Sequence, residues 1–121
     1  MNLNNILIGS ENPQGLAVYY TALFGTPGWE EGGFTGWRVG TGGLMVGRHD
    51  QVKGQNAEPG RLIWNIESPD VRGDFARLKA AGAVVVREPY SPAEAAGEAS
   101  EVLIATFSDP DGNYFQLVSP M

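Results

Sequence analysis

Apolar and polar residues follow one another along the chain in an order that occurs twice. In the first half, a short apolar strand precedes a helix predicted over Gln14–Phe24, and Gly25 stands where such a helix ends. In the second half, a strand ending at about Glu67 precedes a helix that starts at Ser68-Pro69-Asp70 and is terminated by Gly82. Further strand patterns follow each helix, so both halves are predicted to be β-α-β-β-β modules.

These further strands are predicted where β-branched and aromatic residues stand between glycines and polar residues. They cover Gly28–Glu31, Phe34–Val39 and Leu44–Arg48 in the first half, and Ala83–Arg87, Glu101–Phe107 and Asn113–Val118 in the second. Two loops rich in Gly, Pro, Ala and polar residues, Asp50–Gly60 and Pro89–Ser100, are predicted to be a linker and a mobile flap.

A β-α-β-β-β module covers one face of its sheet with its helix and leaves the other face bare. Two modules can cover these bare faces by curling their sheets around a shared cavity, where a ligand would bind. The predicted fold class is therefore α+β, with two β-α-β-β-β modules forming a curved sheet around that cavity. We expect one domain over residues 1–121, with module 1 at about 1–49, the linker at 50–60 and module 2 at about 61–121.

The last strand contains a polar residue that needs an explanation. It follows the turn sequence Asp109-Pro110-Asp111-Gly112, whose residues favour a tight turn. Alternation directs Phe115 and Leu117 toward the core and Tyr114 and Gln116 toward the opposite face. Gln116 is therefore a candidate ligand contact, and the alternative is that its amide satisfies a backbone group or a buried water.

Three tryptophans fall on predicted strands. Trp64 alternates with Leu62 and Ile66 and is predicted to lie in the core, which directs Arg61 and Asn65 toward the cavity.

For Trp37, core and cavity are about equally favoured, whereas Trp29 stands among glycines and acids and is expected at a rim or interface. Met45 lies between Gly43 and Gly47 and would form an adaptable pocket wall.

Composition excludes several classes of function. A formal charge of −6 argues against a nucleic-acid surface and mildly favours neutral or cationic ligands. No apolar stretch is long enough for a membrane span, and the N-terminus lacks the pattern of a signal peptide, so we expect a cytoplasmic protein. Cysteine is absent and His49 is the one histidine, which leaves no thiolate nucleophile and no evident Ser-His pair.

The doubled module pattern, with VYYTALFG, LKAAG and above all SDPDGNYFQLV, resembles the vicinal oxygen chelate superfamily, also called the glyoxalase/bleomycin resistance/dioxygenase family. The resemblance covers essentially the whole chain. It implies a fold shared by metal-dependent isomerases, epimerases, ring-cleaving dioxygenases and thiol transferases, and by drug-binding proteins that are not catalysts. It also implies a homodimer, because small two-module chains of this family usually pair.

The resemblance further implies four metal-ligand positions, on the first and last strand of each half, where His, Gln or Glu is typical. Here they fall on Asn5, Met45, Gln116 and Arg61, or on Leu62 or Ile63 in place of Arg61. None of these is a carboxylate or an imidazole, and a guanidinium repels a cation. We therefore expect no metal and no other cofactor.

Two functions from different classes remain. One is a metal-independent protein that binds or sequesters a small aromatic or amphipathic compound, as the drug-resistance members do. The other is an enzyme of the same fold, lyase-, isomerase- or dioxygenase-like, with a non-standard or absent metal site. We favour the binding function and expect no catalytic residue. The expected partners are a small aromatic molecule and a second copy of the chain. We expect no nucleic acid and no membrane as a partner. The expected ligand contacts are Asn5, Trp37, Met45, Arg61, Asn65, Tyr114 and Gln116.

Overall fold

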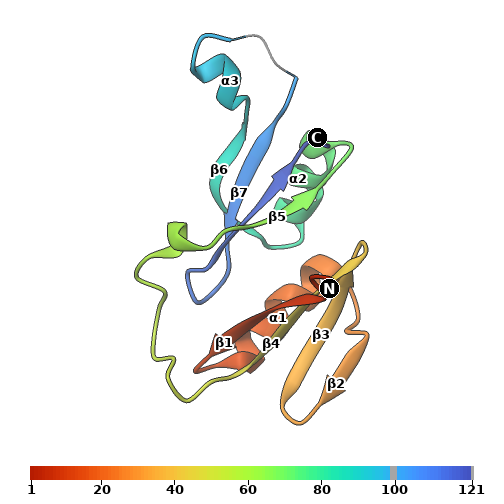
Figure 1. Cartoon of the computed structure of the whole chain (residues 1–121), viewed down its shortest axis with the longest axis vertical. Coiled ribbons are helices and arrows are strands. Elements are labelled where there is room, and N and C mark those ends of the chain that lie inside the picture. The colour runs from red at the N-terminus through yellow and green to blue at the C-terminus, as the bar shows by residue number, and fades with distance from the viewer. Residues whose placement is uncertain (99–100, 121) are drawn as a thin grey trace. The chain divides into compact units, whose positions relative to one another are not determined.

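The computed structural model describes residues 1–98 and 101–120. The chain divides into two compact units, unit 1 at Met1–Gln55 and unit 2 at Asn56–Met121 (Figure 1). The boundary falls within the segment 50–60 that the sequence predicts as a linker.

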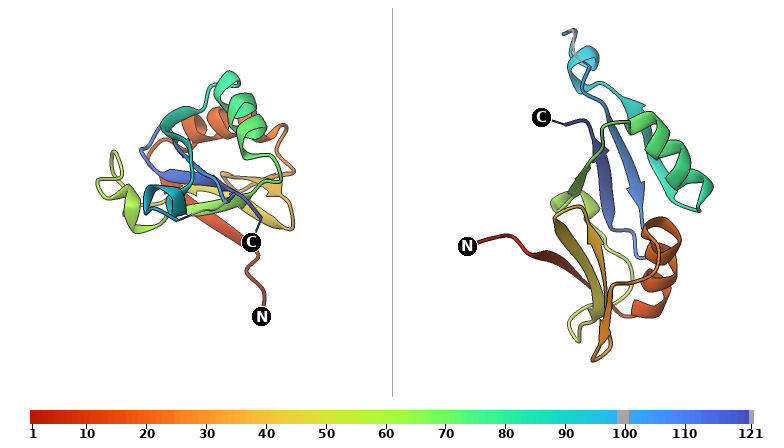
Figure 2. Two further views of the ribbon diagram at one scale, coloured as in Figure 1. Left: turned by 90° about the horizontal axis from the view of Figure 1, so that it is seen from above. Right: turned by 90° about the vertical axis from the view of Figure 1, so that its right-hand side faces the viewer.

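Unit 1 is a β-α-β-β-β module. Its four strands form one sheet, the N-terminal sheet, in the order β1-β4-β3-β2, with β1 parallel to β4 and the other neighbours antiparallel. Its elements are β1 (Asn5–Ser10), α1 (Pro13–Phe24), β2 (Trp29–Glu31), β3 (Phe34–Val39) and β4 (Gly42–Arg48). Helix α1 lies along one face of this sheet (Figure 2).

Unit 2 repeats the same topology. Its strands form the C-terminal sheet in the order β5-β8-β7-β6, with β5 parallel to β8. Its elements are η1 (Pro59–Arg61), β5 (Trp64–Glu67), α2 (Val71–Ala80), β6 (Val84–Tyr90), α3 (Pro92–Ala95), β7 (Ile104–Ser108) and β8 (Tyr114–Val118). The duplicated module and the α+β class predicted from the sequence are confirmed, whereas the shared cavity stays a prediction.

The largest boundary differences from the sequence prediction lie in unit 2. The strand expected from Arg61 begins at Trp64, because Pro59 starts a 3-10 turn in which the backbone amide of Arg61 donates to Glu58. Strand β7 is predicted from residue 101 but begins at Ile104, which pairs with Tyr90 of β6. The predicted flap 89–100 contains the end of β6 and α3, and its last two residues lie outside the described part of the chain.

Both long helices begin with the same capping arrangement. The side chain of Asn12 accepts from the amide of Gly15 at 3.3 Å, and that of Asp70 accepts from the amide of Gly73 at 3.0 Å. A Cβ on either glycine would collide with the capping side chain, which explains glycine at both positions. In each unit a buried serine at the preceding strand end, Ser10 or Ser68, accepts from the amide of the cap residue.

The core of unit 1 fixes the position of one tryptophan that alternation left open. The ring of Trp37 is 3% exposed and lies 5.9 Å from the ring of Tyr20 on α1. Its indole Nε1 donates to the carbonyl of Gly25 at 3.1 Å, so the buried donor is satisfied. Leu16 and Leu44 are buried with it. Trp37 therefore belongs to the core beneath α1.

The core of unit 2 is a series of stacked aromatic rings. Phe75 of α2 stacks on Phe107 at 5.4 Å, Phe107 on Phe115 at 5.3 Å, and Phe115 on Trp64 at 5.1 Å. Because Phe115 and Leu117 are buried on this side, the predicted phase of β8 is confirmed. Trp64 points to the same side, as predicted, but it is only half-buried, at the margin of the core.

The acidic turn before β8 is held together by one carboxylate. Asp109 is 4% exposed, and its Oδ1 accepts from the amides of Asp111 and Asn113 at 2.9 and 3.0 Å. The side-chain amide of Asn113 also donates to its Oδ2 at 2.9 Å. Gly112 has φ 82°, a conformation that favours glycine. The turn prediction is confirmed, with Asp109 as its centre.

Within the described residues, no helix combines the length and the apolar character needed to cross a membrane.

We predict that Asp109→Ala lowers the free energy of unfolding by about 2–3 kcal/mol, because three donors lose a charged acceptor in a buried turn. Asp50→Ala is the matched control, since its side chain is 94% exposed, and should change stability by less than about 0.5 kcal/mol. Denaturant unfolding monitored by circular dichroism measures both. Equal effects of the two substitutions would contradict the central role of Asp109.

Candidate functional site

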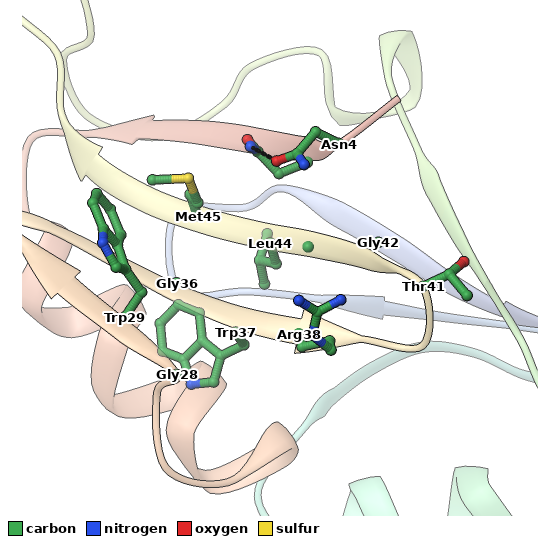
Figure 3. A pocket seen from close by; sticks show the side chains of 12 residues that line it. Asn4, Gly28, Trp29, Gly36, Trp37, Arg38, Thr41, Gly42, Leu44 and Met45 are labelled. Atoms are coloured by element: carbon green, nitrogen blue, oxygen red, sulfur yellow. Dashed lines mark hydrogen bonds between the residues drawn. The ribbon is translucent and has the colours of Figure 1, made fainter. Parts of the chain in front are cut away.

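One face of the N-terminal sheet is turned away from α1, and we call it the open face. Leu44 and Val46 of β4 are buried toward the helix, so Gly43 and Met45 point the other way. A hollow of about 380 Å³ lies on the open face (Figure 3). Figure 3 shows Trp29 and Met45 toward one end of it and Arg38 and Thr41 toward the other.

Strand pairing arranges the open face in two rows that run across the sheet. Trp29 of β2 pairs with Gly36, Gly36 with Met45, and Met45 with Leu7 of β1. We call this set, Trp29, Gly36, Met45 and Leu7, the apolar row. The neighbouring row is Arg38, Gly43 and Asn5, in which Gly43 pairs with both of the others. We call this set the polar row.

Glycine at the centre of each row leaves the floor of the hollow without a side chain. A Cβ on Gly36 would lie 3.4 Å from Met45 Cγ and 3.7 Å from Trp29 Cε3, so these two side chains flank the glycine closely. A Cβ on Gly43 would lie 3.3 Å from Asn5 Cβ. The indole of Trp29 remains 45% exposed. The apolar row is therefore a platform of sulfur and aromatic carbon that a flat molecule can stack on.

The polar groups of the hollow are amides, a hydroxyl and one guanidinium. Asn5 Nδ2 donates to Asn4 Oδ1 at 2.8 Å, which orients the two amides toward each other. Thr41 supplies the hydroxyl, and Arg38 the positive charge. The lining contains no Asp, Glu or His.

A second group of polar side chains lies on the face of the C-terminal sheet opposite α2. Asn65 of β5 pairs with Gln116 of β8, and Gln116 pairs with Thr106 of β7. Gln116 Nε2 donates to Thr106 Oγ1 at 3.0 Å. Tyr114 precedes Gln116 by two residues and so shares its face. The partner of the Gln116 amide is thus a threonine hydroxyl, which differs from the backbone group or water considered from the sequence.

The expected contact residues belong to both units. Asn5 and Met45 meet in the hollow of unit 1, whereas Asn65, Tyr114 and Gln116 share a face of unit 2. Trp37 borders the hollow, but its ring packs under α1.

Arg61 lies in η1 with its side chain 75% exposed, and its Nη2 is 2.8 Å from Glu58 Oε2. It is therefore in a turn before β5 and not on a strand.

Sequence reasoning missed three polar side chains of the hollow, Arg38, Asn4 and Thr41. Arg38 follows Trp37 directly, so its orientation could be known only once Trp37 was assigned to the core. Asn4 precedes β1, where alternation gives no signal. Trp29, which was expected at a rim or interface, lies at the border of the hollow.

The repeated caps identify the fourth of the implied metal-ligand positions. Ser10, Asn12 and Gly15 correspond to Ser68, Asp70 and Gly73, because each set makes the same hydrogen bonds.

The offset in residue number between these two sets also relates Asn5 to Ile63 and Leu7 to Asn65. The position that the sequence assigned to Arg61, Leu62 or Ile63 is thus Ile63. The four residues are two amides, a thioether and an alkyl group, a set that does not suit a divalent metal ion.

The described residues contain no group of three or more His, Asp or Glu side chains that could hold a metal ion. His49, the one histidine, is half exposed and accepts from the amide of Gln51 at 3.1 Å, as a loop residue does.

Comparison with known proteins identifies relatives of the whole chain. The family model described as a glyoxalase-like domain matches residues 5–118. Among solved structures, a glyoxalase-related enzyme from Fulvimarina pelagi is 19% identical, with a TM-score of 0.72 over 99% of this chain and 88% of that one. A glyoxalase/bleomycin resistance protein/dioxygenase family enzyme from Burkholderia phytofirmans PsJN is 16% identical, with a TM-score of 0.71 over all of both chains.

A glyoxalase/bleomycin resistance protein from Albidiferax ferrireducens T118 is 20% identical, with a TM-score of 0.69 over 97% of this chain and 98% of that one. No curated protein matches the chain. At these identities the structural likenesses show a shared fold.

We predict that the untagged protein, purified without chelators, carries no stoichiometric divalent metal, because the four implied positions offer no carboxylate or imidazole. Elemental analysis measures the metal content per chain. About one Fe, Zn, Mn or Ni per chain that disappears in Gln116→Leu would contradict this prediction.

Proposed function

This chain belongs to the glyoxalase-like domain family, and on that premise we propose that it is a metal-independent binding protein for a small aromatic or amphipathic compound. The observation that carries the proposal is the hollow on the open face of unit 1. There Trp29 and Met45 form an apolar platform beside the amides of Asn4 and Asn5. Such a combination of an apolar surface with few polar groups is typical of small-molecule sites.

The size and exposure of the hollow support a small ligand. A volume of about 380 Å³ lies at the lower end of the range of ligand pockets, roughly 300–1,000 Å³. An indole that is 45% exposed retains apolar surface to cover, and a stacked ring would cover it. Antibiotic sequestration of the kind known in the family is one role in which such binding is sufficient.

The chemistry of the lining supports binding over catalysis. Arg38 is its one charged side chain, and a guanidinium offers hydrogen-bond donors but no acceptor. The hydroxyl of Thr41 has no imidazole or carboxylate beside it in the lining to activate it. The lining thus supplies orientation and apolar contact but no general base.

We retain Asn5 and Met45 as ligand contacts on unit 1, and Asn65, Tyr114 and Gln116 as ligand contacts on unit 2. Their faces are the ones that the helices leave uncovered. A cytoplasmic location stays a proposal.

We predict that the uncharged probe 2-naphthamide binds the protein and that Trp29→Leu weakens this binding by about 1–2 kcal/mol, because the stacking surface is lost. Val18→Ala is the control, since Val18 is 74% exposed on α1, on the other side of the sheet. Isothermal titration calorimetry measures both. No binding at millimolar probe, or equal affinities for the two variants, would count against the proposal.

We also propose a homodimer that pairs along β1, the edge strand of the N-terminal sheet, and leaves the hollow accessible. Leu7 of β1 is 53% exposed and does not line the hollow, so this edge has apolar surface to bury. We predict a dimer at micromolar concentration in sedimentation velocity, and its dissociation by Leu7→Arg. Val18→Arg places the same charge on α1 and should leave the dimer intact. A monomeric wild-type protein would contradict this proposal.

A further inference from the structure

We propose that the ligand of the unit 1 hollow is an aromatic carboxylate, and that Arg38 binds the carboxylate. This inference rests on the proposed function and names the chemical class of its ligand. It depends on the two rows of the open face, which place an apolar platform next to a cation.

Arg38 is the basic residue of the hollow, and it has no acidic partner. It lies on β3, is exposed, and makes no side-chain hydrogen bond or ion pair with the residues at 1–98 and 101–120. Other arginines of the chain are engaged: Arg61 with Glu58 and Arg77 with Asp74. The guanidinium of Arg38 is thus left with its full set of donors for a ligand.

The charge of the hollow is opposite to that of the chain. The chain has 14 acidic and 8 basic residues, yet the lining contains Arg38 and no acid. The net charge favours a neutral or cationic ligand, but a ligand is attracted mainly by the groups it contacts, since exposed charges more than about 8 Å away are largely screened at physiological salt. The local chemistry therefore favours an anion.

The geometry of the polar row suits a carboxylate. Gly43 separates Arg38 from Asn5 and has no side chain, so the space above it is bounded by a guanidinium on one strand and an amide on another. Asn5 donates one of its amide hydrogens to Asn4 Oδ1 and retains the second. A guanidinium fork and an amide N–H can both donate to a planar carboxylate.

The distance between the two rows suits an aromatic acid. Gly36 and Gly43 are diagonal neighbours on β3 and β4, a separation of about 7–8 Å. A ring stacked on Trp29 and Met45 above Gly36 would place a carboxylate on its edge above Gly43. One or two fused rings span this separation, whereas an aliphatic acid would leave the platform uncovered.

The test uses three matched probes, 2-naphthoate, 2-naphthamide and cyclohexanecarboxylate, measured by isothermal titration calorimetry at low salt. We expect 2-naphthoate to bind at least about fivefold more tightly than either of the others, and this preference to decrease as salt is added. R38Q should abolish the preference of naphthoate over naphthamide. R48Q removes the same charge from the same sheet outside this hollow and should retain the preference.

The outcomes separate this inference from the proposed function. Equal binding of the two naphthyl probes, still weakened by Trp29→Leu, would overturn the carboxylate assignment and leave aromatic binding in place. A preference for naphthoate that survives in R38Q would overturn the role of Arg38. Tighter binding of 2-naphthyl phosphate than of 2-naphthoate would overturn the choice of carboxylate as the anion. No binding of either naphthyl probe would overturn both proposals.

Discussion

The packing of α1 against Trp37 and Leu44 decides which face of the N-terminal sheet is buried. Because side chains alternate along a strand, a shift of one residue would exchange the two faces completely. The contact of Trp37 with Tyr20 and its hydrogen bond to Gly25 keep β3 in one phase. The open face, with its apolar and polar rows, is a direct consequence of this packing.

The two modules share a strand order and a helix-capping arrangement but differ in the chemistry of their core and surface side chains. Each begins its helix with a serine, a capping side chain and a glycine at matching places. Their cores differ, since unit 2 relies on stacked rings from Phe75 to Trp64.

Their helix-free faces differ as well. Unit 1 presents Trp29 and Met45, and unit 2 presents Gln116 bonded to Thr106. Duplication has thus preserved the positions of the side chains but not their chemistry, which explains why the implied metal-ligand positions hold two amides, a thioether and an alkyl group.

The order of the elements could be predicted because its signals are local. Proline and glycine mark the ends of α1, and Asp109 with Gly112 defines the turn before β8. The face of the sheet to which Trp37 points could not be predicted. Alternation along β3 allows either face, and the contact of Trp37 with Tyr20 of α1, which is distant in sequence, selects one. The sequence predicts Arg61 on a strand because the alternation of apolar residues does not reveal the 3-10 turn at Pro59.

Arg38 illustrates a different limit of sequence reasoning. The net charge of the chain averages over the whole surface, whereas a ligand meets only the side chains around it. The sign of the charge in the hollow depends on which residues β3 and β1 bring to either side of Gly43. That information is present only in the strand register.

We propose the open face of unit 1 as the ligand site. Nuclear magnetic resonance of the ¹⁵N-labelled protein tests this proposal, because the three tryptophans give three indole signals. On titration with 2-naphthamide, we expect the largest shifts for the Trp29 indole and the amides of Gly36 and Gly43, and a small shift for Trp64. Largest shifts at Trp64 or along α1, with Trp29 unchanged, would contradict it.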